Sequence, residues 1–141
     1  MAKNVIFDSG FWYALYDERD NYHNDAILFE EYLKIYNLII PWPILYETLN
    51  TRFVRRNNWL SSFENYIKSP NVLILSDESY RERALNLVFD LKRGVNSYSL
   101  VDLVIREILK DTTIKIDALV TFNPKDFIDI CMLRNLEIFN G

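Results

Sequence analysis

Short apolar runs alternate along the chain with longer segments whose apolar residues recur at helical spacing. The runs expected as strands are residues 5–7, 38–40, 72–75, 118–121 and 136–139. The segments expected as helices include residues 11–16, 23–35, 60–67 and 99–110 and the short turn 124–128. Two more helices are expected, one from Pro43 to a break at Asn57 and Asn58, and one that Ser76 or Asp77 caps. Strands that alternate with helices predict a parallel sheet covered on both faces. We therefore expect a single three-layer α/β domain, over residues 1–141, with right-handed crossovers.

Single residues add detail to three of these helices. Asn21 is expected to cap the helix over residues 23–35. In the helix near Pro43, the residues Leu45, Leu49 and Phe53 recur at four-residue spacing and are expected to form one buried stripe. In the helix after Ser76 or Asp77, the residues expected on the buried face are Tyr80, Ala84, Leu87, Val88 and Leu91, with Gly94 at the C-terminal end.

Composition and charge narrow the class of protein. Half of the 141 residues are hydrophobic, which suits a globular domain with a sizeable core. The net charge of −4 and an isoelectric point near 5.0 argue against bulk electrostatic binding to nucleic acids or anionic membranes. The single cysteine, Cys131, rules out an intrachain disulfide, fits a reducing cytoplasm and is expected in the core. No apolar run is long enough for a signal segment or a membrane span, so we expect a cytoplasmic protein without a membrane partner.

Basic residues gather near two expected helix ends, in spite of the acidic balance. Arg52, Arg55 and Arg56 form one group, and Lys92 and Arg93 form the other. Two interpretations are open for them. They can contact the phosphates of a nucleic acid, or they can be cations that interact favourably with a helix dipole.

Two acids follow directly on expected strands. Asp8 comes after residues 5–7, and Asp126 lies in the turn after residues 118–121. Ligands of open α/β sheets bind outside the carboxyl ends of the strands, so both acids are candidates for a functional site. A structural role is open for each: Asp8 can cap the following helix, and Asp126 can be a surface acid of a helical turn.

Two further acids lie in expected helices. Asp102 stands in the apolar run 100–105, where an unpaired carboxylate is costly and requires a partner. Ser99 in a capping box, Arg106 at the i+4 position, or a metal ion can be that partner. Glu47 lies opposite the apolar stripe of its helix and is either a functional acid or an exposed helix acid.

These acids form an oxygen-only set of candidate ligands: Asp8, Glu47, Asp102 and Asp126. Carboxylates without His or Cys favour Mg²⁺ or Mn²⁺ over Zn²⁺. Such clusters serve the metal-assisted hydrolysis of phosphodiesters. Ser9 and Ser99 can orient carboxylates or phosphate by hydrogen bonds, and Ser99 can equally cap its helix.

The order of these motifs resembles that of the PIN-domain nucleases, above all the small VapC-type toxins. The matching segments are Val5-Ile6-Phe7-Asp8-Ser9-Gly10, the polar turn 20–26, Pro41-Trp42-Pro43-Ile44-Leu45-Tyr46-Glu47, Ser99-Leu100-Val101-Asp102 and Thr121-Phe122-Asn123-Pro124-Lys125-Asp126. Each segment alone is a weak signal. Their order and spacing over nearly the whole chain make the resemblance specific.

The resemblance implies a three-layer α/β/α PIN-like domain with a five-stranded parallel sheet. It implies an endoribonuclease that hydrolyses RNA phosphodiester bonds by metal-activated water, with Mg²⁺ or Mn²⁺ held by Asp8, Glu47, Asp102 and Asp126. It further implies the toxin of a toxin–antitoxin pair, with a cognate antitoxin and a homodimer. The chain departs from the family at Asn123, where many members have an acid and where the neutral amide is a weaker ligand.

Two other functions compete with this interpretation. A phosphatase of the haloacid-dehalogenase type also begins with a strand that ends in Asp, but it needs a second Asp two residues later, where Gly10 stands. We therefore reject it. A non-catalytic PIN-like module that binds RNA or protein is the alternative, and Asn123 is the residue that favours it.

Overall fold

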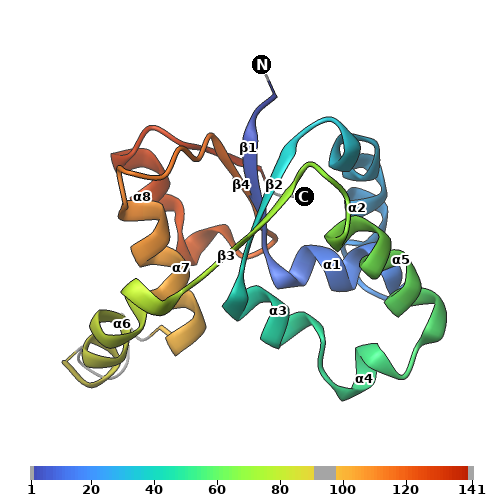
Figure 1. The fold of residues 1–141 in the computed structure, drawn as a ribbon, viewed down its shortest axis with the longest axis horizontal. Coiled ribbons are helices and arrows are strands. Elements are labelled where there is room, and N and C mark those ends of the chain that lie inside the picture. Colours follow the sequence, from blue (N-terminus) through green and yellow to red (C-terminus); the bar gives the residue numbers. More distant parts are fainter. Residues whose placement is uncertain (1, 91–97, 140–141) are drawn as a thin grey trace.

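The computed structural model describes residues 2–90 and 98–139, and a parallel sheet forms its centre (Figure 1). The five strands follow the order β3-β2-β1-β4-β5, and each neighbouring pair is parallel. Their bounds are Asn4–Phe7 for β1, Asn37–Pro41 for β2, Val72–Leu75 for β3, Ala118–Val120 for β4 and Glu137–Phe139 for β5. The expected fold class and all five strands are confirmed, with strand ends that differ by at most one residue.

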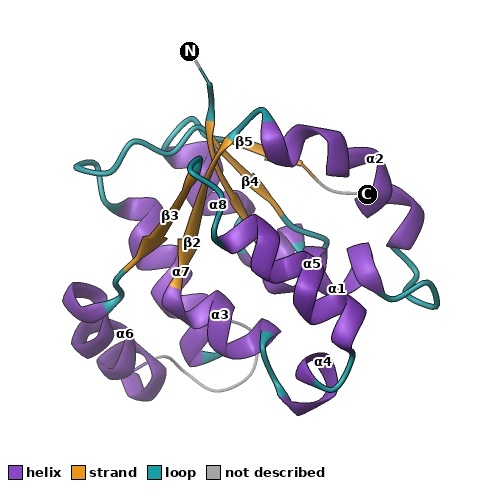
Figure 2. Ribbon diagram, turned by 45° about the vertical axis from the view of Figure 1, so that its right-hand side comes forward, coloured by secondary structure: helices purple, strands orange, loops and turns teal. Residues whose placement is uncertain are grey.

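Helices cover both faces of the sheet and make the three layers. Figure 1 shows α1 (Ser9–Tyr16), α2 (His23–Glu30) and α5 (Asn57–Ile67) on one side, with α7 (Leu100–Lys110) and α8 (Ile128–Leu133) on the other. The other helical segments are η1 (Glu31–Lys34), α3 (Trp42–Thr48), α4 (Thr51–Val54), α6 (Glu78–Asp90) and η2 (Pro124–Asp126). In Figure 2, β2 and β3 run down toward α3 and α6, the helices that follow them.

Aromatic side chains fill the core between the sheet and α1. Val5, Ile6 and Phe7 of β1 are fully buried, as expected for the central strand of the sheet. The rings of Phe11 and Trp12 in α1 pack on Phe7, with centroids 4.6 Å and 6.1 Å away. This packing fixes the end of β1 against the start of α1, where Asp8 lies.

The single helix expected from Pro43 through Phe53 is wrong, because the chain breaks into α3 and α4. Leu49 ends α3 and is 38% exposed, so it does not belong to the buried stripe, whereas Leu45 and Phe53 are buried as expected. Asn50 caps α4: its side-chain oxygen accepts a hydrogen bond from Phe53 N at 3.1 Å. An Asn side chain that bonds the nearby backbone competes with continuation of the helix.

Other helix ends also differ from the expectation. Asn21 does not cap α2, since Tyr22 holds the N-cap position and the Asp20 carboxylate accepts the Tyr22 N–H at 2.9 Å. The helix expected to reach residue 35 changes to 3-10 geometry at Glu31. Helix α5 begins at Asn57, three residues early, and α8 follows η2 where the sequence predicts only a turn. These short elements carry too few apolar repeats for a clear periodic signal.

Helix α6 presents the face that the sequence predicts. Ala84 is buried, while Tyr80, Leu87 and Val88 pack partly buried against the core. The expectations for Leu91, Lys92, Arg93 and Gly94 lie outside the described residues.

Two expectations from composition can be compared with the structure. Cys131 is a free thiol and is buried in the core, as expected. Within residues 2–90 and 98–139, no helix combines the length and the apolar character that crossing a membrane requires.

Candidate active site

Asp8 lies at the carboxyl end of β1, the middle strand of the sheet. It is the N-cap of α1, and its Oδ1 accepts a hydrogen bond from Ser9 N at 2.8 Å. Its Oδ2 accepts a second hydrogen bond from Thr121 Oγ1 at 3.0 Å. Thr121 is fully buried and follows β4, the strand beside β1. The helix-cap role of Asp8 is therefore confirmed, and the same carboxylate is held at the sheet edge where ligands bind in such folds.

Glu47 reaches the same edge from α3. The Ser9 hydroxyl donates a hydrogen bond to Glu47 Oε1 at 2.9 Å, so Ser9 connects Glu47 to Asp8 through its hydroxyl and its backbone N–H. Tyr13 fixes the end of α3, because its hydroxyl lies 3.3 Å and 3.2 Å from the carbonyl oxygens of Glu47 and Thr48. Ser9 thus orients a carboxylate, as the sequence suggests.

Asp102 stands in the first turn of α7. Ser99 is the N-cap of this helix, and its hydroxyl oxygen accepts the Asp102 N–H at 3.1 Å, which confirms the capping role. The alternative of an Asp102–Arg106 ion pair is wrong. The Arg106 guanidinium instead donates two hydrogen bonds of 2.8 Å to the two carboxylate oxygens of Asp129. Bidentate pairs of this kind are among the strongest charge-assisted hydrogen bonds, which explains the preference of Arg106.

Asp126 ends η2, just after β4. Asn123 holds it, because the side-chain amide of Asn123 donates a hydrogen bond to Asp126 Oδ2. The Asn123 backbone N–H in turn donates to Thr121 Oγ1 at 3.1 Å. Arg106 Nη1 donates to the Asp126 carbonyl oxygen at 2.7 Å. The turn that carries Asp126 is thus tied to Asp8 through Thr121, and to α7 through Arg106.

The carboxylates at this edge act on one another through their charges. Burial raises the pKa of Asp8, the charges of Asp102 and Asp126 raise it further, and its two hydrogen-bond donors oppose the shift. Burial also raises the pKa of Asp102, and the charge of Asp126 adds to the effect. The pKa of Glu47 is raised by loss of hydration and then by the charges of Asp8 and Asp102. The four acids expected from the sequence therefore share one region of like charge.

This donor set fits a hard divalent cation in its chemistry, since all four groups offer carboxylate oxygens. Within residues 2–90 and 98–139, no ion pair joins any of the four acids to a basic side chain. In the same ranges, no three acidic, histidine or cysteine side chains converge closely enough to hold a metal ion as they stand. The structure therefore brings the acids into one region without closing them around one point.

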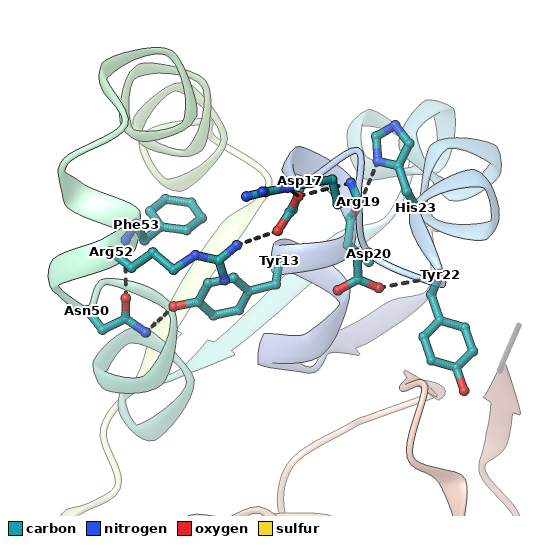
Figure 3. A network of polar contacts seen from close by, with 10 residues as sticks. Tyr13, Asp17, Arg19, Asp20, Tyr22, His23, Asn50, Arg52 and Phe53 are labelled. Atoms are coloured by element: carbon teal, nitrogen blue, oxygen red, sulfur yellow. Dashed lines mark hydrogen bonds and ion pairs between the residues drawn. The ribbon is translucent and has the colours of Figure 1, made fainter.

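Two of the three arginines at the end of α4 contact other side chains of the protein. Arg52 forms an ion pair with Asp17, and its guanidinium lies 5.9 Å from the centre of the Tyr13 ring (Figure 3). Arg56 lies 5.0 Å from the centre of the Trp59 ring. The Arg52 contacts join α4 to α1, whereas the Arg56 contact lies within the start of α5.

Sequence reasoning missed two residues that position the acids. Thr121 is the last residue of an expected strand, and that place at the sheet edge is a signal that could have identified it. Asp129 has no such local signal, because its partner Arg106 lies 23 residues away in the sequence.

The sheet order and the layers define a PIN-like α/β/α domain. No family model matches the chain, and no curated protein matches it. Among solved structures, the chain is similar to the Mycobacterium tuberculosis toxin VapC20, described as cleaving the sarcin-ricin loop: the TM-score is 0.67 at 18% identity, over 89% of this chain and 94% of that one. It is also similar to VapBC2 of Rickettsia felis, solved bound to a DNA fragment from its promoter: the TM-score is 0.55 at 20% identity, over 97% of this chain and 98% of that one. These similarities show the fold, and they confirm the structural resemblance to VapC-type PIN-domain proteins.

Proposed function

We propose that this protein is a Mg²⁺- or Mn²⁺-dependent endoribonuclease whose metal ligands are Asp8, Glu47, Asp102 and Asp126. The observation that carries the proposal is the repulsion among the negative charges of these acids. Three of them, Asp8, Glu47 and Asp102, have a raised pKa, mainly because burial removes their hydration. The hydrogen bonds around them orient the carboxylates but supply no positive charge. A divalent cation bound between the carboxylates offsets the repulsion among their charges. The PIN-like fold and its similarity to a VapC toxin support RNA as the substrate.

Three of the four acids accept a hydrogen bond from a side chain that positions them for this role. Thr121 donates to Asp8, Ser9 donates to Glu47, and Asn123 donates to Asp126. Asp8 and Asp102 are the main ligands in the proposal, while Glu47 and Asp126 complete the set. The chemistry that a divalent ion supplies in such a site is Lewis-acid stabilisation of the phosphate and a more acidic water molecule. Asn123 thus contributes as a hydrogen-bond donor to Asp126 rather than as a carboxylate ligand.

We also propose that the protein is the toxin of a toxin–antitoxin pair and acts as a homodimer. The two structural neighbours support the first part, since one is a toxin and the other is a VapBC assembly. A hollow of about 280 Å³ between α3, α6 and α7 supports the second, because apolar side chains such as Leu85, Leu100 and Val104 line it. Leu85 and Leu100 are 46% and 45% exposed, and homodimer interfaces are more apolar than the rest of a protein surface.

The test of the nuclease is cleavage of a single-stranded RNA with Mg²⁺ or Mn²⁺, and with excess chelator. Asp102→Asn keeps the shape of the side chain and removes its charge, so we expect the cleavage rate to fall about a hundredfold or more, as a loss of metal catalysis worth several kcal/mol implies. Asp25→Asn is the matched control, because Asp25 also stands in the first turn of a helix, α2. Cleavage that persists in Asp102→Asn or in excess chelator contradicts the metal nuclease. RNA that is bound but not cut by the unaltered protein favours the non-catalytic module.

A further inference from the structure

A column of aromatic rings runs from the core to the surface beside the candidate active site. Phe11 in α1 is fully buried, and its ring stacks on Phe122 with centroids 6.4 Å apart. Phe122 in turn stacks on Tyr22, with centroids 4.6 Å apart and planes inclined by only 3°. Tyr22 is 41% exposed, so it forms the outer end of the column.

Phe122 stands between two residues that hold the candidate acids. Thr121, which precedes it, donates a hydrogen bond to Asp8. Asn123, which follows it, donates to Asp126. Successive Cα atoms lie about 3.8 Å apart, so the backbone that carries the aromatic column is part of the same turn that positions two acids.

Tyr22 is presented by a turn with many internal hydrogen bonds. Asp20 Oδ1 accepts the Tyr22 N–H at 2.9 Å, and the Asp20 carbonyl accepts the His23 N–H at 3.1 Å. His23 Nδ1 lies 2.7 Å from the carbonyl oxygen of Ala14, which ties the turn to α1. Figure 3 shows the Tyr22 ring projecting from this turn, away from the polar network of Asp17 and Arg52. An ordered turn that exposes an aromatic ring loses little conformational freedom when a ligand stacks on the ring.

We propose that Tyr22 is a stacking platform for an unpaired nucleobase of the RNA substrate, next to the phosphate that is cleaved. This inference rests on the proposed function, because it takes the acids beside Phe122 to be the site of cleavage. Every base has a π-face, and proteins that bind single-stranded RNA place its bases on exposed aromatic rings. Stacking also suits a protein with a net charge of −4, which gains little from long-range attraction of phosphates.

The test is the affinity for a fluorescently labelled single-stranded RNA, measured by anisotropy in chelator so that no cleavage occurs. Tyr22→Leu keeps an apolar cover over Phe122 but removes the π-face, and we expect the Kd to rise about tenfold. Tyr22→Trp keeps the π-face and is expected to bind as tightly as the unaltered protein. The slope of log Kd against log salt is expected to stay unchanged in Tyr22→Leu, because no phosphate contact is lost.

Tyr32→Leu is the matched control. Tyr32 is 37% exposed and stacks on Tyr36 with centroids 5.5 Å apart. It lies in η1, which precedes the amino end of β2, whereas the candidate active site lies at the carboxyl ends of the strands. We expect its Kd to equal that of the unaltered protein. The unfolding midpoint of each variant shows whether it is folded. A 2-aminopurine base in the RNA is expected to lose fluorescence when it binds the unaltered protein, and to lose less when it binds Tyr22→Leu.

The outcomes separate this inference from the proposed function. RNA binding that depends on Tyr22, without cleavage when metal is added, supports the platform and contradicts the nuclease. Metal-dependent cleavage with the same Kd for Tyr22→Leu and the unaltered protein overturns the platform and leaves the nuclease in place. Absence of measurable RNA binding, or an equal loss of affinity in Tyr32→Leu, also overturns the platform.

Discussion

Replacing Thr121 by Val tests whether the hydroxyl of this residue holds the Asp8 carboxylate in place. The change keeps a fully buried, β-branched side chain of nearly the same volume and removes only the hydrogen-bonding atom. That atom donates to Asp8 Oδ2 at 3.0 Å and accepts the Asn123 N–H at 3.1 Å. A hydrogen bond to a charged group contributes about 1.5–3 kcal/mol, so we expect a loss of roughly 2–3 kcal/mol in the free energy of unfolding. At this chain length, that loss lowers the unfolding midpoint by about 6–12 °C.

The matched control is Thr48→Val in α3. Thr48 is also fully buried, but its Oγ1 has no hydrogen-bond partner within the described part of the chain. Removing a buried hydroxyl without a partner relieves a desolvation penalty, so we expect Thr48→Val to be neutral or to stabilise by about 1 kcal/mol. The two substitutions are chemically identical and are predicted to have opposite signs or clearly different sizes.

Urea unfolding followed by circular dichroism, in chelator at pH 7, measures both variants without the influence of a metal ion. The Thr121 hydroxyl lowers the pKa of Asp8, so its loss destabilises the folded protein most when Asp8 is charged, and the effect shrinks as the pH falls through the pKa of Asp8. Thr121→Val is also expected to reduce metal-dependent cleavage about 10–100-fold, as for other residues that orient metal ligands. Equal destabilisation by the two Thr→Val changes refutes the reasoning, because the partners of the hydroxyl then have no influence.

Three further predictions follow from the structure. Arg106→Met is expected to cost about 2 kcal/mol in chemical denaturation, below the usual cost of breaking a buried pair, because the Asp129 side chain is 56% exposed and can be hydrated. Asp8, Glu47 and Asp102, whose pKa is raised, bind protons more tightly in the folded than in the unfolded chain. Their protonation therefore stabilises the folded protein fully below about pH 4, and this stabilisation is lost as the pH rises through the raised pKa values. In chelator, these three acids are therefore expected to destabilise the folded protein increasingly as the pH rises, and Mg²⁺ is expected to raise the unfolding midpoint more at pH 7 than at pH 5; an equal effect of Mg²⁺ at both values contradicts ligation by these acids. Leu85→Glu, in the hollow between α3, α6 and α7, is expected to convert a dimer to a monomer in light scattering, and a mass that does not change places the interface elsewhere.

The centre of the sheet could be predicted from the sequence because its inner strands are buried on both faces. Val5, Ile6 and Phe7 form a continuous apolar run, and the structure buries all three. The same signal cannot tell an inner strand from an edge strand, since Leu73 of the edge strand β3 is equally apolar and is 56% exposed. Which strands lie at the edges is decided by the path of the connections, and periodicity carries no information on that path.

The break between α3 and α4 shows a second limit of pattern reasoning. Leu45, Leu49 and Phe53 have helical spacing, but Asn50 bonds the backbone and ends the regular helix. The break turns Leu49 toward solvent and lets Phe53 pack against Tyr13, with ring centroids 5.7 Å apart. One local hydrogen bond therefore overrides a periodic signal that spans the nine residues from Leu45 to Phe53.

The four acids of the candidate site could be chosen from the sequence because each stands at a strand end or among apolar residues. Their partners are harder to find. Thr121 and Asp8 lie 113 residues apart in the sequence, and only the pairing of β1 with β4 brings them together. The side chains that position the acids are thus set by the tertiary fold rather than by local spacing.

Arg106 offers a way to decide between a structural and a functional role for Asp102. A structural acid at this position has a cation within reach, four residues later on the same helix, and an i,i+4 pair offsets its charge. The chain instead engages Arg106 with Asp129 and with the Asp126 carbonyl, and burial raises the pKa of Asp102. Within residues 2–90 and 98–139, Asp102 and Asp126 therefore have no ion pair of their own, and the charge of Arg106 only partly opposes the raised pKa of Asp102. The engagement of Arg106 elsewhere therefore favours the proposal that these acids bind a cation, and Arg106 itself holds the turn that carries Asp126.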